Sequence, residues 1–356
     1  MLVCCLAIVA CGGTADAPTD SGRTTATPSA TGSPTPEPAT VTILGGGDVM
    51  LGRTLGEGIV ANGALWPFEQ ITDVLAGADI AFVNLESPLT DGGTPADKDF
   101  VFRGPPEAAV GLAGVGIDVV TLANNHAFDY GLRGLLETWA TLNEASVAQV
   151  GSGERESAAR APVVLERNGL RIAFLAYVNT GPDSISDFVV EDTKATADRA
   201  GVAWLTPEAV AEDVAKAKQD ADLVVVAFQA GVEYTETPIA LQIESAHAAI
   251  DAGASVVFGH HPHVLQGIET YNEGVIIYSL GNLVFDFDHV DYLYPDLPSA
   301  LSGMLLVELS KEGVVGCEFV PMVVAEKDGR PRVAEGDEAE AVLERMRRLS
   351  DGSCGL

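Results

Sequence analysis

Residues 41–48 read VTILGGGD, and this stretch decides the fold class. Strand-forming side chains are followed by glycines and a carboxylate, the pattern of a buried strand that ends at a polar loop. The glycines at 45–47 permit a tight turn from this strand into a helix. Further apolar runs lie at 78–86 and 116–122, and helical patterns lie at 68–78, 105–115 and 131–145. Strands that alternate with helices indicate an α/β fold.

The second half of the chain repeats this alternation. Strand patterns lie at 170–178, 222–229 and 255–259, and helical patterns lie at 207–218 and 238–252. Runs at 275–280, 304–309 and 314–323 predict antiparallel strands, and 335–349 predicts a closing helix. Because neither a repeat nor a second linker interrupts residues 41–356, we predict one folded domain there.

Polar side chains follow five of the predicted strands, at the point where each strand ends. They are Asp48, then Asn84 and Glu86, then Asn124, Asn125 and His126, then Gln229, and finally His260, His261 and His263. Ligands of α/β sheets bind beyond the carboxyl ends of the strands, so we expect these side chains to converge. Carboxylate, amide and imidazole groups together suit a divalent ion such as Mn, Zn or Fe(II). A lone histidine is usually structural, but four of the six histidines lie in two of these loops, which favours a metal or catalytic site.

Six motifs, in this order between residues 41 and 325, resemble those of the CapA family of capsule and poly-γ-glutamate synthesis proteins. They are GDVMLGR (47–53), NLE (84–86), FRGPPE (102–107), ANNH (123–126) with Asp129 and Gly131, GHHPHV (259–264) and YSLGN (278–282). The resemblance implies a four-layer α/β/β/α sandwich of the metallo-dependent phosphatase type. We therefore expect residues 41–356 to form a CapA-like domain with that fold.

The resemblance also implies roles for individual residues. Asp48 would bind one metal ion, Glu86 would bridge two ions, and Asn124 would bind the second. His261 and His263 would be further ligands, with His260 as a neighbour, and Gln229 stands where the family has a histidine ligand. The catalytic group would comprise His126 as general acid or donor to a phosphate oxygen, Asn125, and Arg103 as the fork for an anionic ligand.

Two departures bear on how many ions the site holds. Phosphoesterases begin with Asp-x-His, whereas this chain has Met50 in place of the imidazole, as the CapA family does. The family segment His-Trp-Gly-x-Glu-Tyr here reads QAGVEY (229–234). Two bridged ions would activate water and hold a phosphate oxygen. Since one imidazole is replaced by Gln229, the sequence leaves two ions, one ion or none open.

Residues 1–11 predict a lipoprotein signal peptide. This apolar run is shorter than the roughly 20 residues that cross a bilayer, and residues 8–11 (IVAC) resemble a bacterial lipobox with Cys11 as the lipidated residue. Residues 12–40, rich in Thr, Pro and Ser, predict a disordered linker. We therefore expect an extracytoplasmic protein that contacts the bacterial cell membrane through a lipid anchor.

The formal net charge of −31 at pH 7 limits the partners of the general surface. Nucleic acid and anionic lipid would be repelled, so we expect no nucleic-acid partner. Cys317 and Cys354 lie outside the signal peptide, and their pairing in an oxidising compartment stays open.

Three functions stay open on the sequence alone, and so does whether the chain is an enzyme. The first is a surface-anchored CapA-like protein in the synthesis or export of an anionic capsule polymer such as poly-γ-glutamate, with a metal-assisted hydrolase site. The missing imidazoles at Met50 and Gln229 favour the second, a non-catalytic module that binds the polymer or a member of its synthesis complex. The third is a general extracytoplasmic metallophosphoesterase with the same site.

Overall fold

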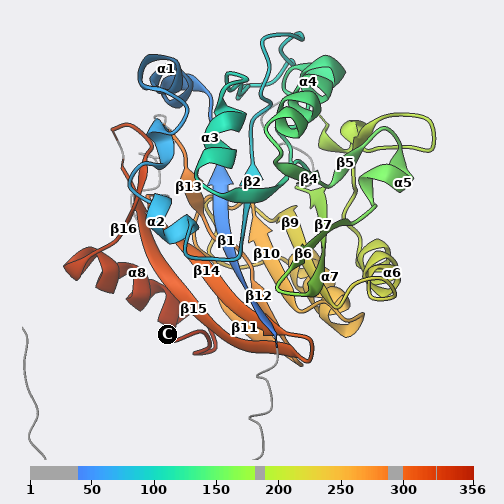
Figure 1. Cartoon of the computed structure of the whole chain (residues 1–356), viewed down its shortest axis with the longest axis vertical. Helices are drawn as coiled ribbons and strands as arrows, with labels where there is room; N and C mark the ends of the chain where they lie inside the picture. The colour runs from blue at the N-terminus through green and yellow to red at the C-terminus, as the bar shows by residue number, and fades with distance from the viewer. Residues whose placement is uncertain (1–38, 181–188, 288–299, 326) are drawn as a thin grey trace, which may run out of the picture. The chain divides into compact units, whose positions relative to one another are not determined.

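The computed structural model describes residues 39–180, 189–287, 300–325 and 327–356 (Figure 1). The predicted signal peptide, with Cys11, lies outside the described residues, and so does the predicted linker apart from its last two positions. Residues from Pro38 onward form one compact unit. Its first strand begins at Thr40, one residue before the predicted start of the folded domain.

The first sheet is mixed and is centred on β1. Its strands, in spatial order, are β16 (Pro331–Val333), β15 (Gly313–Val324), β14 (Leu301–Ser310), β1 (Thr40–Val49), β2 (Ile80–Leu85), β3 (Ile117–Thr121) and β4 (Ala148–Val150), with β13 (Asn282–Val284) beside the end of β1. Strands β1 to β4 are parallel, whereas β14, β15 and β16 are antiparallel neighbours. The parallel half therefore brings the carboxyl ends of β1, β2 and β3 to one edge.

The second sheet has a parallel centre with antiparallel edges. Its strands are β11 (Ile268–Tyr271), β12 (Gly274–Ile277), β10 (Val256–His260), β9 (Leu223–Ala230), β7 (Leu170–Asn179) and β6 (Val163–Arg167). The run at 275–280, expected to be antiparallel, forms β12, which pairs antiparallel with β11 on one side and parallel with β10 on the other. The chain reverses direction once into β11 and again at the β11–β12 hairpin, so β12 returns in the direction of β10.

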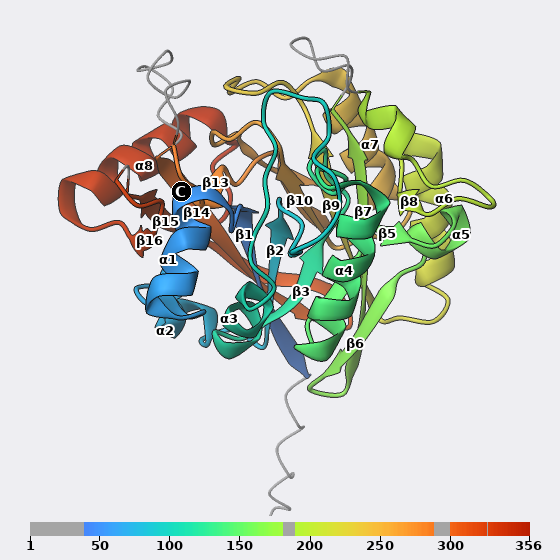
Figure 2. The same ribbon diagram turned by 90° about the horizontal axis from the view of Figure 1, so that it is seen from above.

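Helices cover the outer faces of both sheets, which makes four layers in the order α/β/β/α. The helices beside the first sheet are α1 (Arg53–Asn62), α2 (Thr72–Leu75), α3 (Ala108–Gly114) and α4 (Gly131–Glu144), and those on the second are α6 (Pro207–Ala217) and α7 (Ala240–Asp251). Seen from above, α1, α3 and α4 lie on one side of the strands, and α6 and α7 lie on the other (Figure 2). The predicted four-layer sandwich is confirmed.

Short elements complete the described chain. They are η1 (Trp66–Phe68), β5 (Ser152–Gly153), α5 (Glu156–Ala159), η2 (Val190–Thr193) and β8 (Gly201–Val202). The closing helix α8 (Gly336–Leu349) contacts β14 and β15, and a disulfide between Cys317 and Cys354 ties the segment after it to β15. Within the described ranges, no helix combines the length and apolar character needed to cross a membrane.

Aromatic rings fill the space between the two sheets. Phe82 of β2 stacks on Phe174 of β7 and on Phe258 of β10, each with ring centroids 5.8 Å apart. A Cβ atom on Gly45 would lie 2.3 Å from the Phe258 ring, and one on Gly47 would lie 2.1 Å from the Gly281 carbonyl oxygen. The glycines at 45–47 therefore lie inside β1 and admit the opposing ring and backbone, so the predicted strand-to-helix turn at these residues is wrong.

Candidate metal centre

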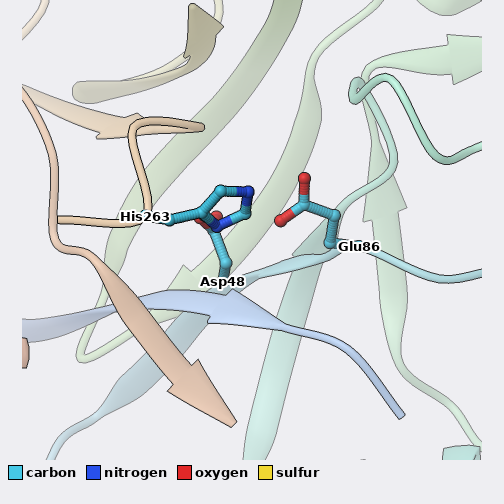
Figure 3. A group of neighbouring side chains, drawn as sticks. All are labelled: Asp48, Glu86 and His263. Carbon is cyan, nitrogen blue, oxygen red and sulfur yellow. The ribbon is translucent and has the colours of Figure 1, made fainter. Parts of the chain in front are cut away.

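Three buried side chains from both sheets point toward one another beyond the carboxyl ends of the strands. Asp48 lies near the end of β1, Glu86 follows β2, and His263 lies in the loop after β10 (Figure 3). One ligand atom from each lies within 4.8 Å of the others. The convergence that the strand ends predict is present, and it joins two sheets.

Left-handed backbone conformations aim the imidazoles of the loop after β10. His261 has a φ of 99° and His263 a φ of 57°, values that residues other than glycine seldom adopt. The Nδ1 atom of His263 lies 2.9 Å from Asn282 Oδ1, and Asn282 Nδ2 faces the His263 carbonyl oxygen at 3.5 Å. With Nδ1–H donated to Asn282, Nε2 of His263 carries the lone pair that a cation needs.

Asp48 is fully buried and lies beside two imidazoles. Its Oδ1 atom is 3.3 Å from Nδ1 of His260, and its Oδ2 atom is 3.4 Å from Nδ1 of His263. Burial alone would raise the pKa of Asp48, but the two imidazoles outweigh burial and hold this pKa below its usual range. Asp48 is therefore an ionised ligand at neutral pH.

Glu86 is equally buried but experiences the opposite balance. Burial, followed by the negative charge of Asp48, raises the pKa of Glu86 well above its usual range. The charges of Glu86 and Asp48 in turn raise the pKa of His263, against the lowering effect of its burial. A second anion this close to Asp48 is costly unless a cation lies between them.

Several polar atoms around this point are buried without a hydrogen-bond partner among the described residues. They are Asp48 Oδ2, Glu86 Oε2, both ring nitrogens of His260, and His261 Nδ1. Buried polar atoms in native proteins are normally paired, so this concentration points to an absent partner. Carboxylate oxygens and imidazole nitrogens suit a borderline divalent cation, and the residues present fit one.

Amide side chains fill the other side of Glu86. Gln229, at the end of β9, donates from Nε2 to Glu86 Oε1 at 2.7 Å and to Asn125 Oδ1 at 3.0 Å. Asn84 donates to Asp48 Oδ1 at 2.8 Å and to Gln229 Oε1 at 3.0 Å. The structure thus brings Gln229 and Asn125 to the centre, with amide hydrogens rather than lone pairs facing the carboxylate.

Asn124 is directed elsewhere. Its Nδ2 donates to the Leu85 carbonyl oxygen at 2.8 Å and to Asn84 Oδ1 at 3.0 Å, and its Oδ1 accepts from the His126 backbone N–H at 3.1 Å. Asn124 therefore braces the strand ends and does not face the carboxylates. Its predicted role as a ligand of a second ion has no support from this placement.

His126 belongs to a neighbouring buried group with Asp129 and Lys98. Asp129 Oδ2 lies 2.7 Å from His126 Nδ1, Lys98 lies 2.6 Å from Asp129, and the Phe102 ring stacks on the imidazole at 4.1 Å. Burial lowers the pKa of His126 to about 4, and the Asp129 carboxylate only partly offsets this. His126 is therefore neutral at pH 7, with its Nδ1 side held by Asp129 and Nε2 left as the proton-transfer atom.

Two arginines lie on the approach to this group. Arg103 is exposed and its guanidinium stacks over the Tyr130 ring at 4.7 Å. The Arg53 guanidinium stacks over the Phe102 ring at 4.6 Å, and the same ring stacks on His126. Arg53 also pairs with Asp286 at 3.4 Å. Within the described part of the chain the contact of the Arg103 guanidinium is with Tyr130 and not with Asp48 or Glu86, so its predicted catalytic role stays a prediction.

Sequence reasoning missed three supporting residues. Asp129 stands inside the ANNH motif region and Asn282 inside YSLGN, so their positions were visible, but their partners His126 and His263 were not. Lys98 lies between motifs in a segment without helix or strand, and nothing in the sequence connects it to Asp129. Only the tertiary contact reveals it.

Comparison with known proteins gives consistent matches. Residues 42–287 match the family model described as bacterial capsule synthesis protein PGA_cap. The capsule biosynthesis protein CapA of Bacillus anthracis is 30% identical over 325 residues, which cover 89% of this chain and 75% of that protein. The PGA biosynthesis protein CapA of Bacillus subtilis strain 168 is 34% identical over 67% of this chain, which spans 62% of that protein, less than two thirds. A putative 5'-nucleotidase from Staphylococcus aureus, solved with alpha-ketoglutarate, is similar with a TM-score of 0.48 and 14% identity, over 87% of this chain and 58% of that one.

Proposed function

The chain belongs to the family of bacterial capsule synthesis proteins, PGA_cap, and on that premise we propose that it serves the synthesis or export of an anionic capsule polymer of the poly-γ-glutamate type. Its relatives are named for capsule biosynthesis and for PGA biosynthesis, which supports this polymer class. We further propose that Asp48, Glu86 and His263 hold a divalent cation for hydrolysis or transfer at a phosphate or amide bond.

One observation carries the metal-dependent part of this proposal. Ligand atoms of Asp48, Glu86 and His263 lie within 4.8 Å of one another, and an oxygen of each carboxylate is buried without a hydrogen-bond partner in the described chain. A cation bound there supplies charge for polarising a substrate oxygen and for activating water. The pKa of Glu86, raised by burial, would return toward its usual range beside a cation.

The chain's own residues then handle the proton and the anionic substrate. Asp129 fixes the imidazole of His126 through Nδ1, so its Nε2 atom is the group that takes or returns a proton. Lys98 neutralises Asp129 inside the protein. Arg53 and Arg103 would orient carboxylate or phosphate groups of the polymer against an otherwise negative surface, since arginine is a usual partner of both groups.

We also propose that the protein works outside the cytoplasm, anchored to the cell membrane through Cys11. The lipobox-like residues 8–11 and the linker-like composition of 12–40 support this location. The Cys317–Cys354 disulfide supports it independently, because disulfides persist in oxidising compartments. Radiolabelled palmitate incorporation by the unaltered chain, lost in Cys11→Ala, is the expected result, and equal labelling of both would contradict the anchor.

A non-catalytic binding role is the competing proposal. It is favoured by Gln229 and the neighbouring amides, whose hydrogen bonds are already made within the protein. The experiment that separates the two proposals uses metal retention and capsule formation together. The unaltered chain, loaded with Mn(II) and dialysed, is expected to retain metal, and Glu86→Ala is expected to retain none. In a strain lacking the gene, the unaltered chain is expected to restore capsule formation, and the His126→Ala variant is expected not to restore it.

The outcomes divide the proposals cleanly. Capsule formation that survives His126→Ala unaltered would overturn catalysis and leave the binding module. If the unaltered chain retains no metal, the proposal of a metal centre is wrong. Asn62→Ala, on the exposed surface of α1, serves as the control variant for expression.

A further inference from the structure

A continuous chain of amide side chains runs from the loop after β3 to the candidate metal centre. It consists of Asn124, Asn84 and Gln229, each no more than 2% exposed. Each member has hydrogen-bond partners on both its oxygen and its nitrogen. Because an amide presents hydrogens on one side and lone pairs on the other, the orientation of one member restricts the next.

Two backbone groups fix the orientation at the start of the chain. The His126 N–H donates to Asn124 Oδ1 at 3.1 Å, and the Leu85 carbonyl oxygen accepts from Asn124 Nδ2 at 2.8 Å. A backbone N–H can only donate and a carbonyl oxygen can only accept. Turning the Asn124 amide over would oppose like groups at both contacts, so its orientation is set by the fold.

The same orientation then passes to Gln229. Asn124 Nδ2 donates to Asn84 Oδ1 at 3.0 Å, which leaves Asn84 Nδ2 to donate to Gln229 Oε1 at 3.0 Å. Asn84 Nδ2 also donates to Asp48 Oδ1 at 2.8 Å, a second contact that holds the Asn84 amide in this orientation. The Gln229 oxygen is thereby turned away from Glu86, and its NH2 group is turned toward it.

Both hydrogens of the Gln229 NH2 group are used at the centre. Nε2 donates to Glu86 Oε1 at 2.7 Å and to Asn125 Oδ1 at 3.0 Å. A second cation at this point would need lone pairs from these two oxygens and from the side chain at position 229. The partial positive charge of the NH2 group instead lies between them and repels a cation.

From this chain of contacts we infer that the Gln229 amide takes the place of a second metal ion, and that the centre holds a single divalent ion at Asp48, Glu86 and His263. The inference rests on the metal centre of the proposed function and deepens it. A single ion leaves no second cation to position the nucleophile, so the proton-transfer atom of His126 carries that part of the chemistry.

Counting ions in three variants of the full chain tests this inference. Each is loaded with Mn(II), dialysed and measured by elemental analysis: the unaltered chain, Gln229→His and the control Gln242→His. Gln242 is a buried glutamine of α7 that bonds to Gln266, the Tyr278 carbonyl oxygen and the Ile239 N–H, and these contacts do not include Asp48 or Glu86. We expect one ion per chain, two in Gln229→His because an imidazole offers a lone pair, and one in the control.

Each result decides a different statement. Two ions in the unaltered chain would overturn the inference and keep the proposed metal centre, whereas no retained ion would overturn the proposed centre. One ion in a folded Gln229→His protein would also overturn the inference, since Gln229 would then not be what excludes the second ion.

A measurement on the unaltered chain covers the case in which Gln229→His does not fold. The paramagnetic resonance spectrum of the Mn(II)-loaded protein is expected to show the hyperfine pattern of an isolated ion. The spectrum of an exchange-coupled pair would overturn the inference. In parallel, the side-chain NH2 resonance of Gln229, assigned by its loss in Gln229→Ala, is expected to stay protected from solvent exchange during a Mg(II) titration. Loss of that protection would show that the amide turns to bind by its oxygen, which contradicts the inference.

Discussion

Two buried polar groups of this protein differ in how their hydrogen bonds are completed. The metal centre of Asp48, Glu86 and His263 lies between the sheets, whereas the Tyr177 cluster of Tyr177, Asp213 and Arg160 lies between the second sheet and α6. In the Tyr177 cluster, Asp213 accepts from the Tyr177 hydroxyl at 3.0 Å and from two Arg160 nitrogens at 2.7 and 2.9 Å. In the metal centre, one oxygen of each carboxylate has no hydrogen-bond partner in the described chain.

The difference separates a structural cluster from a ligand site. A completed network rigidifies the fold, and removing one member leaves the others exposed to the cost of an unpaired buried group. An incomplete network costs stability in the free protein and is retained where a ligand completes it. Tyr177 and Asp213 are nearly as buried as the metal-centre side chains, and Arg160 is partly exposed. Polar character and burial of the carboxylates therefore do not separate the two groups, and the atoms without a hydrogen-bond partner identify the site.

The largest expected effect comes from Glu86→Gln, which removes the charge of one carboxylate of the metal centre. The isosteric amide removes a charge and keeps an oxygen for Gln229, so we expect loss of retained metal and a metal-free protein at least as stable as the unaltered one. Since burial raises the pKa of Glu86, the unaltered metal-free chain loses stability relative to Glu86→Gln as pH rises above the usual glutamate range.

This expectation is checked by measuring the thermal unfolding of both proteins in the presence of a chelator at two chosen values, pH 5 and pH 8. Metal analysis of both proteins is done in parallel. A Glu86→Gln protein that unfolds more easily than the unaltered chain at the higher pH would show that Glu86 is a structural carboxylate. The comparison between the two clusters would then fail.

Asp213→Ala is the reciprocal change in the Tyr177 cluster. It removes the acceptor of two Arg160 bonds and one Tyr177 bond, and hydrogen bonds to charged groups contribute about 1.5–3 kcal/mol each. Because Arg160 is partly exposed and keeps its bond to Glu212, the loss is smaller than the sum of the three bonds. We expect a loss of about 3 kcal/mol in the free energy of unfolding, measured by urea denaturation, with metal content unchanged. A loss of metal in a folded Asp213→Ala protein would show that the clusters are coupled.

Much of the fold could be predicted from the sequence because the central strands are continuous apolar runs. Strands β2, β3, β7, β9 and β10 and helices α4, α6 and α7 match predicted segments within a few residues. Helix α1 was missed, since Gly56 and Gly58 weaken its helical pattern, and Gly58 is needed where the Trp66 ring packs. Strand β13 has three residues and is defined by its pairing with β1, which no local pattern reports.

The candidate site could be predicted in location but not in orientation. Asp48, Glu86 and His263 follow strand ends, and parallel strands bring such ends together. The side that an amide turns toward a neighbour depends on hydrogen bonds to residues far along the chain, as the contacts of Asn124 with Leu85 and of Gln229 with Asn84 illustrate. The sequence therefore left the number of metal ions open, whereas the hydrogen bonds between the amide side chains favour a single ion.

Asn282→Ala sharpens the comparison by weakening the metal centre without removing a ligand. Asn282 Oδ1 accepts from His263 Nδ1 at 2.9 Å and so orients the imidazole. Loss of such a supporting bond typically lowers metal affinity by about 10–100-fold. Competition with a fluorescent chelator measures the affinity, and Asn143→Ala on α4, away from the centre, is the matched control. An unchanged affinity would mean that His263 is held by other contacts or does not bind the ion.

Tyr177→Phe has the smallest expected effect and tests whether the Tyr177 cluster is structural throughout. The change removes one hydroxyl that donates to Asp213 and leaves the ring in place against Phe228. A single buried hydrogen bond contributes about 1 kcal/mol, and Asp213 keeps its two bonds to Arg160, so we expect a loss of about 1 kcal/mol by urea denaturation. Metal content and capsule formation should be unaffected, because the described contacts of the Tyr177 cluster do not include Asp48 or Glu86. A Tyr177→Phe protein of unchanged stability that no longer supports capsule formation would reverse the assignment, since a completed hydrogen-bond network would then be serving function rather than the fold.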